Sequence, residues 1–427
     1  MSTLDTSPRG QSAAGTASPG ALPADAVPTG TVPTVSVPAG SVPAGAVAAG
    51  TGPVEAALPG QRRPADGTVP GRAASRGGRL YVLDGLRLLA ALSVLVFHYM
   101  ARGGSASKAW GQQSRSVLPG FEPIADYGWL GVEFFFIISG FVICMSCWGR
   151  TPGQFFRSRL TRLYPAYWVA IGLIVVLQEI FPVVVNRRMS LHDILLNLTM
   201  LHEPLGVAHV DGVFWTLWVE MRFYLIFALV VRLGVTYRST AVFCGLWTVG
   251  SVLTQASHNV LLDNLLVPKY SAYFIAGIGF YLIHRFGHHA LSWGIVGISW
   301  LIAQERVIAE TDRFGKMINA HLSGTVGAMV VTVCFVVMAG VALGWFSRLN
   351  WRWLTTAGAL TYPLYLTHEH LGHLVIYGLR DQLPPGVVLA VTAAAMLLLA
   401  WLVHRLAERP LARVMKRALE KPLPPSV

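Results

Sequence analysis

Apolar residues gather in long runs along this chain, and polar or basic residues separate the runs. From Tyr81 onward many runs approach or reach the roughly 20 residues that a helix needs to cross the hydrocarbon core of a bilayer. We count ten such runs and predict ten membrane-spanning helices. They cover residues 84–100, 128–148, 163–182, 213–232, 239–256, 266–285, 290–304, 322–346, 353–378 and 386–405. The pattern therefore predicts an all-α integral membrane protein.

One weaker stretch has a different pattern. Between residues 187 and 203, Leu, Ile and Met side chains lie among polar residues. This spacing predicts an amphipathic helix that lies in the membrane interface rather than crossing the bilayer.

The N-terminal segment has a composition that opposes folding. Residues 1–78 contain no Phe, Trp or Tyr and hold 11 of the 25 prolines. Such a segment cannot bury enough apolar surface to offset the entropy of ordering. We predict a disordered Pro/Ala/Gly-rich cytoplasmic tail over 1–78, a membrane domain over 79–410 and a basic cytoplasmic tail over 411–427. The tail lacks the apolar core of a signal peptide, so we expect the first span to target the chain and stay attached.

Basic residues are distributed unevenly between the loops. The formal net charge is +12, but Lys and Arg lie in short runs between apolar segments, so we expect no nucleic-acid partner. Counting alternate loops gives 20 Lys and Arg on the side of both termini and 10 on the other side. Basic loops stay in the cytoplasm, so this bias places both termini there. We therefore predict a multi-pass protein of the cytoplasmic membrane.

The first span carries ionisable residues at both ends. Arg87 and His98 are eleven residues apart, which places both on one helical face with ~16 Å between their Cα atoms. Asp84 lies about one turn before Arg87 and can pair with it. Ionisable groups within a span usually face a functional cavity, although anchoring at the interface also explains them.

Two arginines follow the second span. Arg159 and Arg162 are an i, i+3 pair at the expected cytoplasmic border. Guanidinium groups so placed can hold phosphates through charge-assisted hydrogen bonds. The ordinary orientation signal of a membrane protein is the alternative explanation.

Acidic residues occur in two other spans. Glu220 and Tyr224 share a face of the fourth span, and the carboxylate needs a partner such as Arg87 or Arg222. A structural ion pair and a catalytic role both explain Glu220. The same two interpretations apply to Glu133 in the second span.

The ninth span contains several histidines, which raises the question of a metal site. The His-Glu-x-x-His zinc spacing would require a histidine four residues after His368, and Gly372 stands there. His370 and His373 have no accompanying cluster of carboxylates or thiolates in the sequence. We therefore predict no metal.

Taken together, five ordered motifs resemble the membrane-bound acyltransferase-3 family. They are Asp84-Gly85-Leu86-Arg87 with His98, Gly131-Val132-Glu133-Phe134-Phe135 leading to Ser139-Gly140-Phe141, Arg159-x-x-Arg162 before Pro165, Trp215-Thr216-Leu217-x-x-Glu220-x-x-Phe223-Tyr224, and Tyr365-Leu366-x-His368. Each motif is weak alone, whereas the ordered set is specific.

The resemblance implies an enzyme with ten membrane helices. It implies transfer of an acetyl or other short acyl group from acyl-CoA, with acetyl-CoA as the expected donor. The expected acceptors are hydroxyls of carbohydrates or glycosylated metabolites, such as cell-surface glycans or macrolide-type antibiotics. The family's essential Arg–His pair corresponds to Arg87 and His98. Its Arg-x-x-Arg motif, implicated in handling acyl-CoA, corresponds to Arg159 and Arg162.

The implied chemistry agrees with the residue types. A hydroxyl is a poor nucleophile near neutral pH, and an imidazole can remove its proton during attack on a thioester. We assign His98 as the general base, with Arg87 and Glu220 organising the cavity. An acyl-histidine intermediate is a rival route. Further candidate site residues are Asp84, Glu133, Tyr224 and His368.

A polytopic transporter or flippase for a glycan or lipid-linked substrate is the alternative function. Such proteins often contain internal repeats with paired broken helices. Here Pro268 and Pro363 interrupt predicted spans singly. We therefore favour an acyltransferase whose partners are the lipid bilayer, acyl-CoA and a carbohydrate or glycosylated acceptor. The sequence leaves the oligomeric state open.

Overall fold

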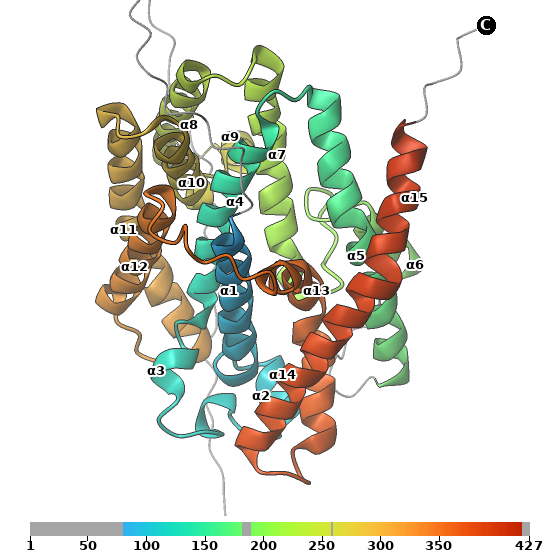
Figure 1. The fold of residues 1–427 in the computed structure, drawn as a ribbon. Coiled ribbons are helices and arrows are strands. Elements are labelled where there is room, and N and C mark those ends of the chain that lie inside the picture. Colours follow the sequence, from blue (N-terminus) through green and yellow to red (C-terminus); the bar gives the residue numbers. More distant parts are fainter. Residues whose placement is uncertain (1–79, 182–188, 258, 421–427) are drawn as a thin grey trace, which may run out of the picture. The chain divides into compact units, whose positions relative to one another are not determined.

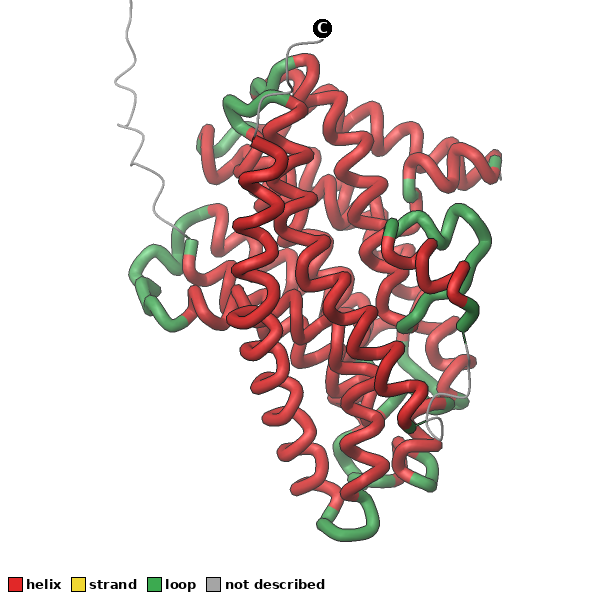
Figure 2. The backbone as a smooth tube through the Cα atoms, turned by 90° about the vertical axis from the view of Figure 1, so that its right-hand side faces the viewer, coloured by secondary structure: helices red, strands yellow, loops and turns green. Residues whose placement is uncertain are grey.

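The described part of the protein consists of helices joined by turns and loops (Figures 1 and 2). The computed structural model describes residues 80–181, 189–257 and 259–420. Within these ranges there is no β-strand, so the predicted all-α class is confirmed. The predicted disordered tail over 1–78 and the last seven residues of the predicted C-terminal tail lie outside the described residues.

The helices have the following bounds. They are α1 Tyr81–Met100, α2 Ser105–Trp110, η1 Ser114–Ser116, α3 Glu122–Ala125, η2 Gly128–Leu130, α4 Gly131–Cys147, α5 Pro152–Ile180, α6 Leu191–Leu198, η3 Gly212–Phe214, α7 Trp215–Leu233, α8 Tyr237–Ser257, α9 Val260–Leu266, α10 Pro268–Phe286, α11 Ala290–Ile318, α12 Gly324–Ala342, α13 Leu354–Leu379, α14 Pro385–Leu402, η4 Val403–Glu408 and α15 Arg409–Glu420.

Each of the ten predicted spans coincides with a long helix. Among the described residues, seven helical segments are long and apolar enough to cross a membrane, and they contain α1, α4, α5, α7, α10, α12 and α14. The other three predicted spans correspond to α8, α11 and α13, which are as long but more polar. The total of ten spans therefore stays a prediction.

Two helices differ in detail from the predicted pattern. The seventh predicted span ends at 304, but α11 continues to Ile318 with acidic and basic residues in its second half. Pro268 does not interrupt a helix, because it is the first residue of α10, where its missing N–H costs nothing. Pro363 does lie inside α13.

Local sequence explains several helix ends. Thr151 and Gln154 form a reciprocal capping box at the start of α5. Ser190 caps α6 by accepting from the backbone N–H of Asp193. Among the described residues of the predicted interfacial stretch, 189–203, only α6 is helical, with Leu191 and Leu195 exposed. Residues 182–188 lie outside the described residues.

The helix α1 lies beside α4 and α13, and α4 packs closely against α10 (Figure 1). Two glycines allow the second contact. A Cβ added at Gly140 would meet the carbonyl oxygen of Phe274, and one added at Gly277 would meet that of Ile137. Small residues thus let two membrane helices approach at backbone distance. This packing fixes the side of α4 that faces α1.

Candidate active site

The histidine of α1 faces a carboxylate of α13. His98 is 5% exposed, and its Nδ1 lies 3.4 Å from Oε1 of Glu369. The Nε of Arg102 lies 3.4 Å from the same oxygen. Glu369 therefore lies between the imidazole and a guanidinium group, an arrangement that holds the imidazole by Nδ1 and leaves Nε2 for a substrate.

Hydrogen bonds between α1 and α13 hold this pair in register. The Tyr99 hydroxyl donates to the backbone carbonyl of His368 at 2.8 Å. The Nε2 of His373 lies 3.0 Å from the carbonyl oxygen of His98, to which it donates. A Cβ at Gly372 would collide with the Tyr99 ring, so this position requires glycine for close approach.

His368 supports the His98 ring from behind. The two ring centroids are 5.0 Å apart, with the rings nearly perpendicular. The Nδ1 of His368 donates to the carbonyl of Tyr365 at 2.9 Å. The sequence prediction that His368 belongs near the site agrees with this position, but His368 packs beside His98 and does not line its cavity.

A small cavity of about 40 Å³ opens beside His98. Its lining includes the polar side chains of His98, Arg102 and Glu133. Aromatic rings form much of the remaining wall, namely those of Phe97, Trp129, Trp215, Tyr270, Phe314 and Tyr365. The cavity is thus mostly apolar with a few convergent polar groups, as ligand sites usually are.

A second cavity of about 70 Å³ contains Arg87, Arg162 and Glu220. Glu220 Oε1 accepts a hydrogen bond from Ser139 Oγ at 2.9 Å. The charges of Arg162 and Glu220 act directly on Arg87. Two guanidinium groups and one carboxylate give this cavity a net positive charge that suits an anionic ligand.

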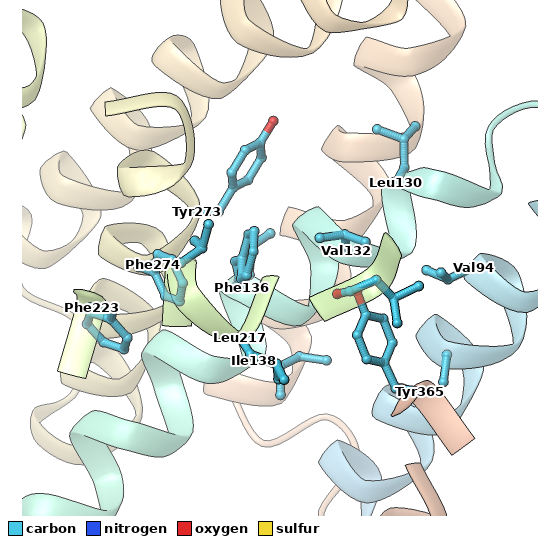
Figure 3. Close-up of a cluster of buried hydrophobic side chains, with 14 of the residues drawn as sticks. Val94, Leu130, Val132, Phe136, Ile138, Leu217, Phe223, Tyr273, Phe274 and Tyr365 are labelled. Atoms are coloured by element: carbon cyan, nitrogen blue, oxygen red, sulfur yellow. The ribbon is translucent and has the colours of Figure 1, made fainter. Parts of the chain in front are cut away.

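The two cavities adjoin. Val132 of α4 and Tyr365 of α13 line both of them (Figure 3). The Tyr365 hydroxyl donates to the carbonyl of Val213 at 3.3 Å and lies 2.9 Å from Thr216 Oγ1. Tyr365 is therefore held in place at the junction.

The two arginines of the Arg-x-x-Arg motif have different surroundings. Arg162 lines the second cavity. Arg159 is 6% exposed, packs on the ring of Phe155 and donates to Ser146 Oγ at 3.2 Å. Of the two arginines, only Arg162 lines the cavity, and Arg159 lies outside the lining.

Other residues that the sequence analysis named interact with the site without lining either cavity. Asp84 contributes its charge to Arg87. Tyr224 is buried beside Phe155 and does not line either cavity. Arg222, a suggested partner of Glu220, instead donates to the carbonyl of Asn264 at 3.1 Å. Glu220 instead interacts with Ser139, Tyr224 and Arg87.

Sequence reasoning missed Glu369 and Arg102 as site residues. A carboxylate inside a span needs a partner, which is a signal that applies to Glu369 as much as to Glu220. Arg102 lies four residues after His98 and therefore near the same helical face. The partner itself comes from a helix more than 260 residues away, so no local pattern identifies it.

A third cavity, of about 250 Å³, lies on the other side of Glu369. Its lining includes Arg102, His209 and His370. His370 Nδ1 lies 2.6 Å from Asp211 Oδ2. Burial raises the pKa of Asp211, and His370 opposes this rise when it is protonated.

The histidines of α13 raised the question of a metal site. The described part of the chain contains no group of three or more His, Cys, Asp or Glu side chains arranged to hold an ion. The groups that can hold an anionic cosubstrate are the two cavity-lining guanidinium groups, of Arg87 and Arg162.

Comparison with known proteins gives partial matches to curated relatives. Residues of this chain are 36% identical over 111 residues to the "Exopolysaccharide production protein ExoZ" of Rhizobium meliloti (strain 1021), covering 24% of this chain and 33% of that protein. They are 30% identical over 161 residues to the "Acyltransferase MdmB" of Streptomyces mycarofaciens, covering 36% and 40%. A third relative, "Protein 2 in picA locus" of Rhizobium radiobacter, is 33% identical over 102 residues, covering 22% and 44%.

The matched stretches thus span a third to under a half of these relatives' own lengths. No solved structure shows a significant match. The model of the acyltransferase-3 family, described as "Acyltransferase domain", matches residues 80–405, which contain both cavities and every predicted site residue. With its apolar helices, the chain is a multi-pass membrane protein. It belongs to the acyltransferase-3 family.

Proposed function

We propose that the protein transfers an acetyl or other short acyl group from acyl-CoA to a hydroxyl of a carbohydrate or glycosylated metabolite at the cytoplasmic membrane. In this proposal His98 is the general base, oriented by Glu369. Arg87 and Arg162 bind the donor. Glu220 and Ser139 complete the donor cavity.

The single observation that carries this proposal is the pair of adjoining cavities. One contains Arg87 and Arg162, and the other contains His98 with Glu369 behind it. Acyl-CoA is elongated, with phosphates at one end and a thioester at the other. The ~16 Å between Arg87 and His98 along α1 suits a ligand that extends from one cavity into the other.

The reaction follows from this arrangement. His98 Nε2 accepts the proton of the acceptor hydroxyl as its oxygen attacks the thioester carbonyl. A carbon–oxygen bond forms, the carbon–sulfur bond breaks, and the coenzyme A sulfur takes the proton back from His98. Glu369 stabilises the imidazolium that forms between these two transfers, as a buried carboxylate does when it faces Nδ1.

Relatives support the acceptor class. One similar protein is named for exopolysaccharide production and another for acyl transfer. The aromatic wall of the His98 cavity also suits the apolar faces of sugar rings, and its carboxylate suits their hydroxyls.

A reconstitution experiment tests the proposal. Membranes with the protein are incubated with radiolabelled acetyl-CoA and the glycan fraction of a strain lacking the gene. We expect label transfer to the glycan, and we expect His98→Ala to reduce it by at least ~100-fold because general-base catalysis typically contributes 10²–10⁴-fold.

His192→Ala is the matched control, because His192 is an exposed histidine of α6. It should retain full activity. Full activity of His98→Ala at equal protein abundance would exclude His98 as the base. Label that remains on the wild-type protein after rapid denaturation at neutral pH, and is absent from His98→Ala, would replace direct transfer with an acyl-histidine route.

A further inference from the structure

A fourth cavity adjoins the His98 cavity on the side of α10 and α11. It has a volume of about 250 Å³ and is lined in part by Lys269, Tyr273 and Glu310. Glu133 and Tyr270 line this cavity and the His98 cavity alike. Glu133 and Tyr270 therefore form a second junction of the His98 cavity. The first junction, at Val132 and Tyr365, leads to the cavity that contains Arg87 and Arg162, whereas the second leads to the cavity beside α10 and α11.

Glu133 places a carboxyl oxygen without a hydrogen-bond donor at that junction. It is 5% exposed, and its Oε2 has no hydrogen-bond partner among the described residues. The nearby cation, Lys269, is already engaged, because its Nζ lies 2.8 Å from Glu310 Oε2. A buried carboxylate oxygen without a donor is costly, so the site lacks a hydrogen-bond donor that a ligand can supply.

The two cavities differ greatly in size. The fourth cavity, at about 250 Å³, has roughly six times the volume of the His98 cavity at about 40 Å³. A sugar ring therefore fits in the larger space, while the smaller one admits a single hydroxyl with the acyl group. The Tyr270 ring packs on Trp215 with centroids 5.3 Å apart, which gives the junction a rigid aromatic face.

We propose that Glu133 is an acceptor-positioning residue. Its Oε2 accepts a hydrogen bond from one hydroxyl of a polyhydroxylated acceptor whose bulk occupies the Lys269–Glu310 cavity, so that a neighbouring hydroxyl reaches His98. This inference rests on the proposed function and deepens it, because it names the side of the His98 cavity from which the acceptor enters.

The cavity beside Glu369 is the competing entrance. It also measures about 250 Å³ and shares Arg102 with the His98 cavity. Its carboxylate, Glu369, is ion-paired with both His98 and Arg102, although its Oε2 also lacks a hydrogen-bond donor. Glu133 has neither an ion pair nor a donor at Oε2 among the described residues, so its carboxyl group is more available to an acceptor, which favours the Lys269–Glu310 side.

Steady-state kinetics test this inference with the glycan fraction of the gene-deletion strain as the acceptor probe, titrated by hexose content. Glu133→Gln should raise the apparent KM for the glycan by at least ~10-fold, because an amide NH₂ replaces one acceptor oxygen and leaves the glycan hydroxyl without its hydrogen bond. The KM for acetyl-CoA should change less than twofold. Glu133→Asp, which keeps the carboxyl group but shortens the side chain, should give an intermediate KM.

The control is Asp312→Asn, which removes one exposed acid of α11 that pairs with Lys316 outside both cavities. It should leave both KM values unchanged. An unchanged glycan KM in Glu133→Gln would overturn the inference. So would a raised glycan KM in Gln178→Ala instead, because Gln178 lines the competing cavity beside Glu369. Absence of label transfer by the wild-type protein would overturn the proposed function itself, which separates the two failures.

Discussion

At the scale of single residues, the site depends on how each buried charge is compensated. Glu369 contacts a histidine and an arginine, Glu220 contacts a serine beside two arginines, and the Oε2 of Glu133 has no donor among the described residues. Buried charges are costly unless they are paired. The oxygen Oε2 of Glu369 also lacks a donor, but Glu369 is ion-paired and Glu133 is not among the described residues. This difference separates an orienting carboxylate, Glu369, from one that is available to a ligand, Glu133.

The orienting role of Glu369 gives the first prediction. Glu369→Gln removes the negative charge that stabilises the imidazolium of His98 but keeps the size of the side chain. We expect kcat to fall by about 100-fold, within the range of general-base effects. The KM for acetyl-CoA should stay within twofold. The measurement is steady-state label transfer at saturating glycan, and Asp381→Asn at the exposed end of α13 is the control.

A fall in kcat equal to that of the control would show that Glu369 does not act on His98. The melting temperature in detergent is measured together with kcat on each variant. A fall in kcat that results from loss of folding would be accompanied by a lower melting temperature.

The two arginines of the cytoplasmic motif give the second prediction. Arg162→Gln should raise the KM for acetyl-CoA by about 10-fold, because Arg162 lines the donor cavity and a charge-assisted contact is lost. Arg159→Gln should raise this KM less, because Arg159 packs on Phe155 and bonds to Ser146. Equal KM values for the two variants, measured at fixed glycan concentration, would contradict this division.

At the scale of helices, close packing between α4 and α10 supports the catalytic wall. Their backbones approach at Gly140 and Gly277, and the same face of α4 presents Phe136 to Phe274 with ring centroids 4.7 Å apart. Figure 3 shows Phe136, Phe274 and Val132 of this wall. Val132 and the next residue, Glu133, line the cavities.

The glycine contact gives the third prediction. Gly277→Ala places a methyl group against the Ile137 carbonyl oxygen and forces the two backbones apart. Overpacking of this kind typically costs 1–3 kcal/mol, so we expect a melting temperature several degrees lower in detergent. Gly294→Ala in α11, where an added Cβ meets nothing within 4 Å, is the control and should not lower it. An unchanged melting temperature for Gly277→Ala would show that the two helices separate without cost.

The helices themselves were largely predictable, because apolar runs and caps are local properties. The ends of α1 and α10 differ from the predicted limits by only a few residues. The length of α11 was underestimated because its second half carries charges that interrupt the apolar run, although Lys269 of α10 pairs with Glu310 there. Tertiary ion pairs let a helix continue where its own sequence suggests an end.

At the scale of the whole molecule, the distribution of basic residues gives the fourth prediction. If both termini are cytoplasmic, the loop after α12 lies in the cytoplasm and the loop after α13 lies outside. A cysteine introduced at exposed Asp381 should react with a membrane-impermeant maleimide in intact cells. A cysteine at exposed Arg348 should react only after the cells are permeabilised.

The described native cysteines Cys144, Cys147 and Cys244 are buried and Cys334 is partly buried, so they should add little background. Reaction of both introduced cysteines in intact cells would contradict the predicted topology.

The sequence by itself determined the helical class, the family, and five of the charged or imidazole side chains that line the two adjoining cavities, those of Arg87, His98, Glu133, Arg162 and Glu220. These properties follow from apolar periodicity and from short motifs, which are local. Only the tertiary structure decided which charges meet: Glu369 reaches His98 from the ninth predicted span, Arg162 turns toward Arg87 while Arg159 turns away, and Glu133 remains without a donor. Pairing depends on how distant helices pack, and no spacing along one helix contains that information.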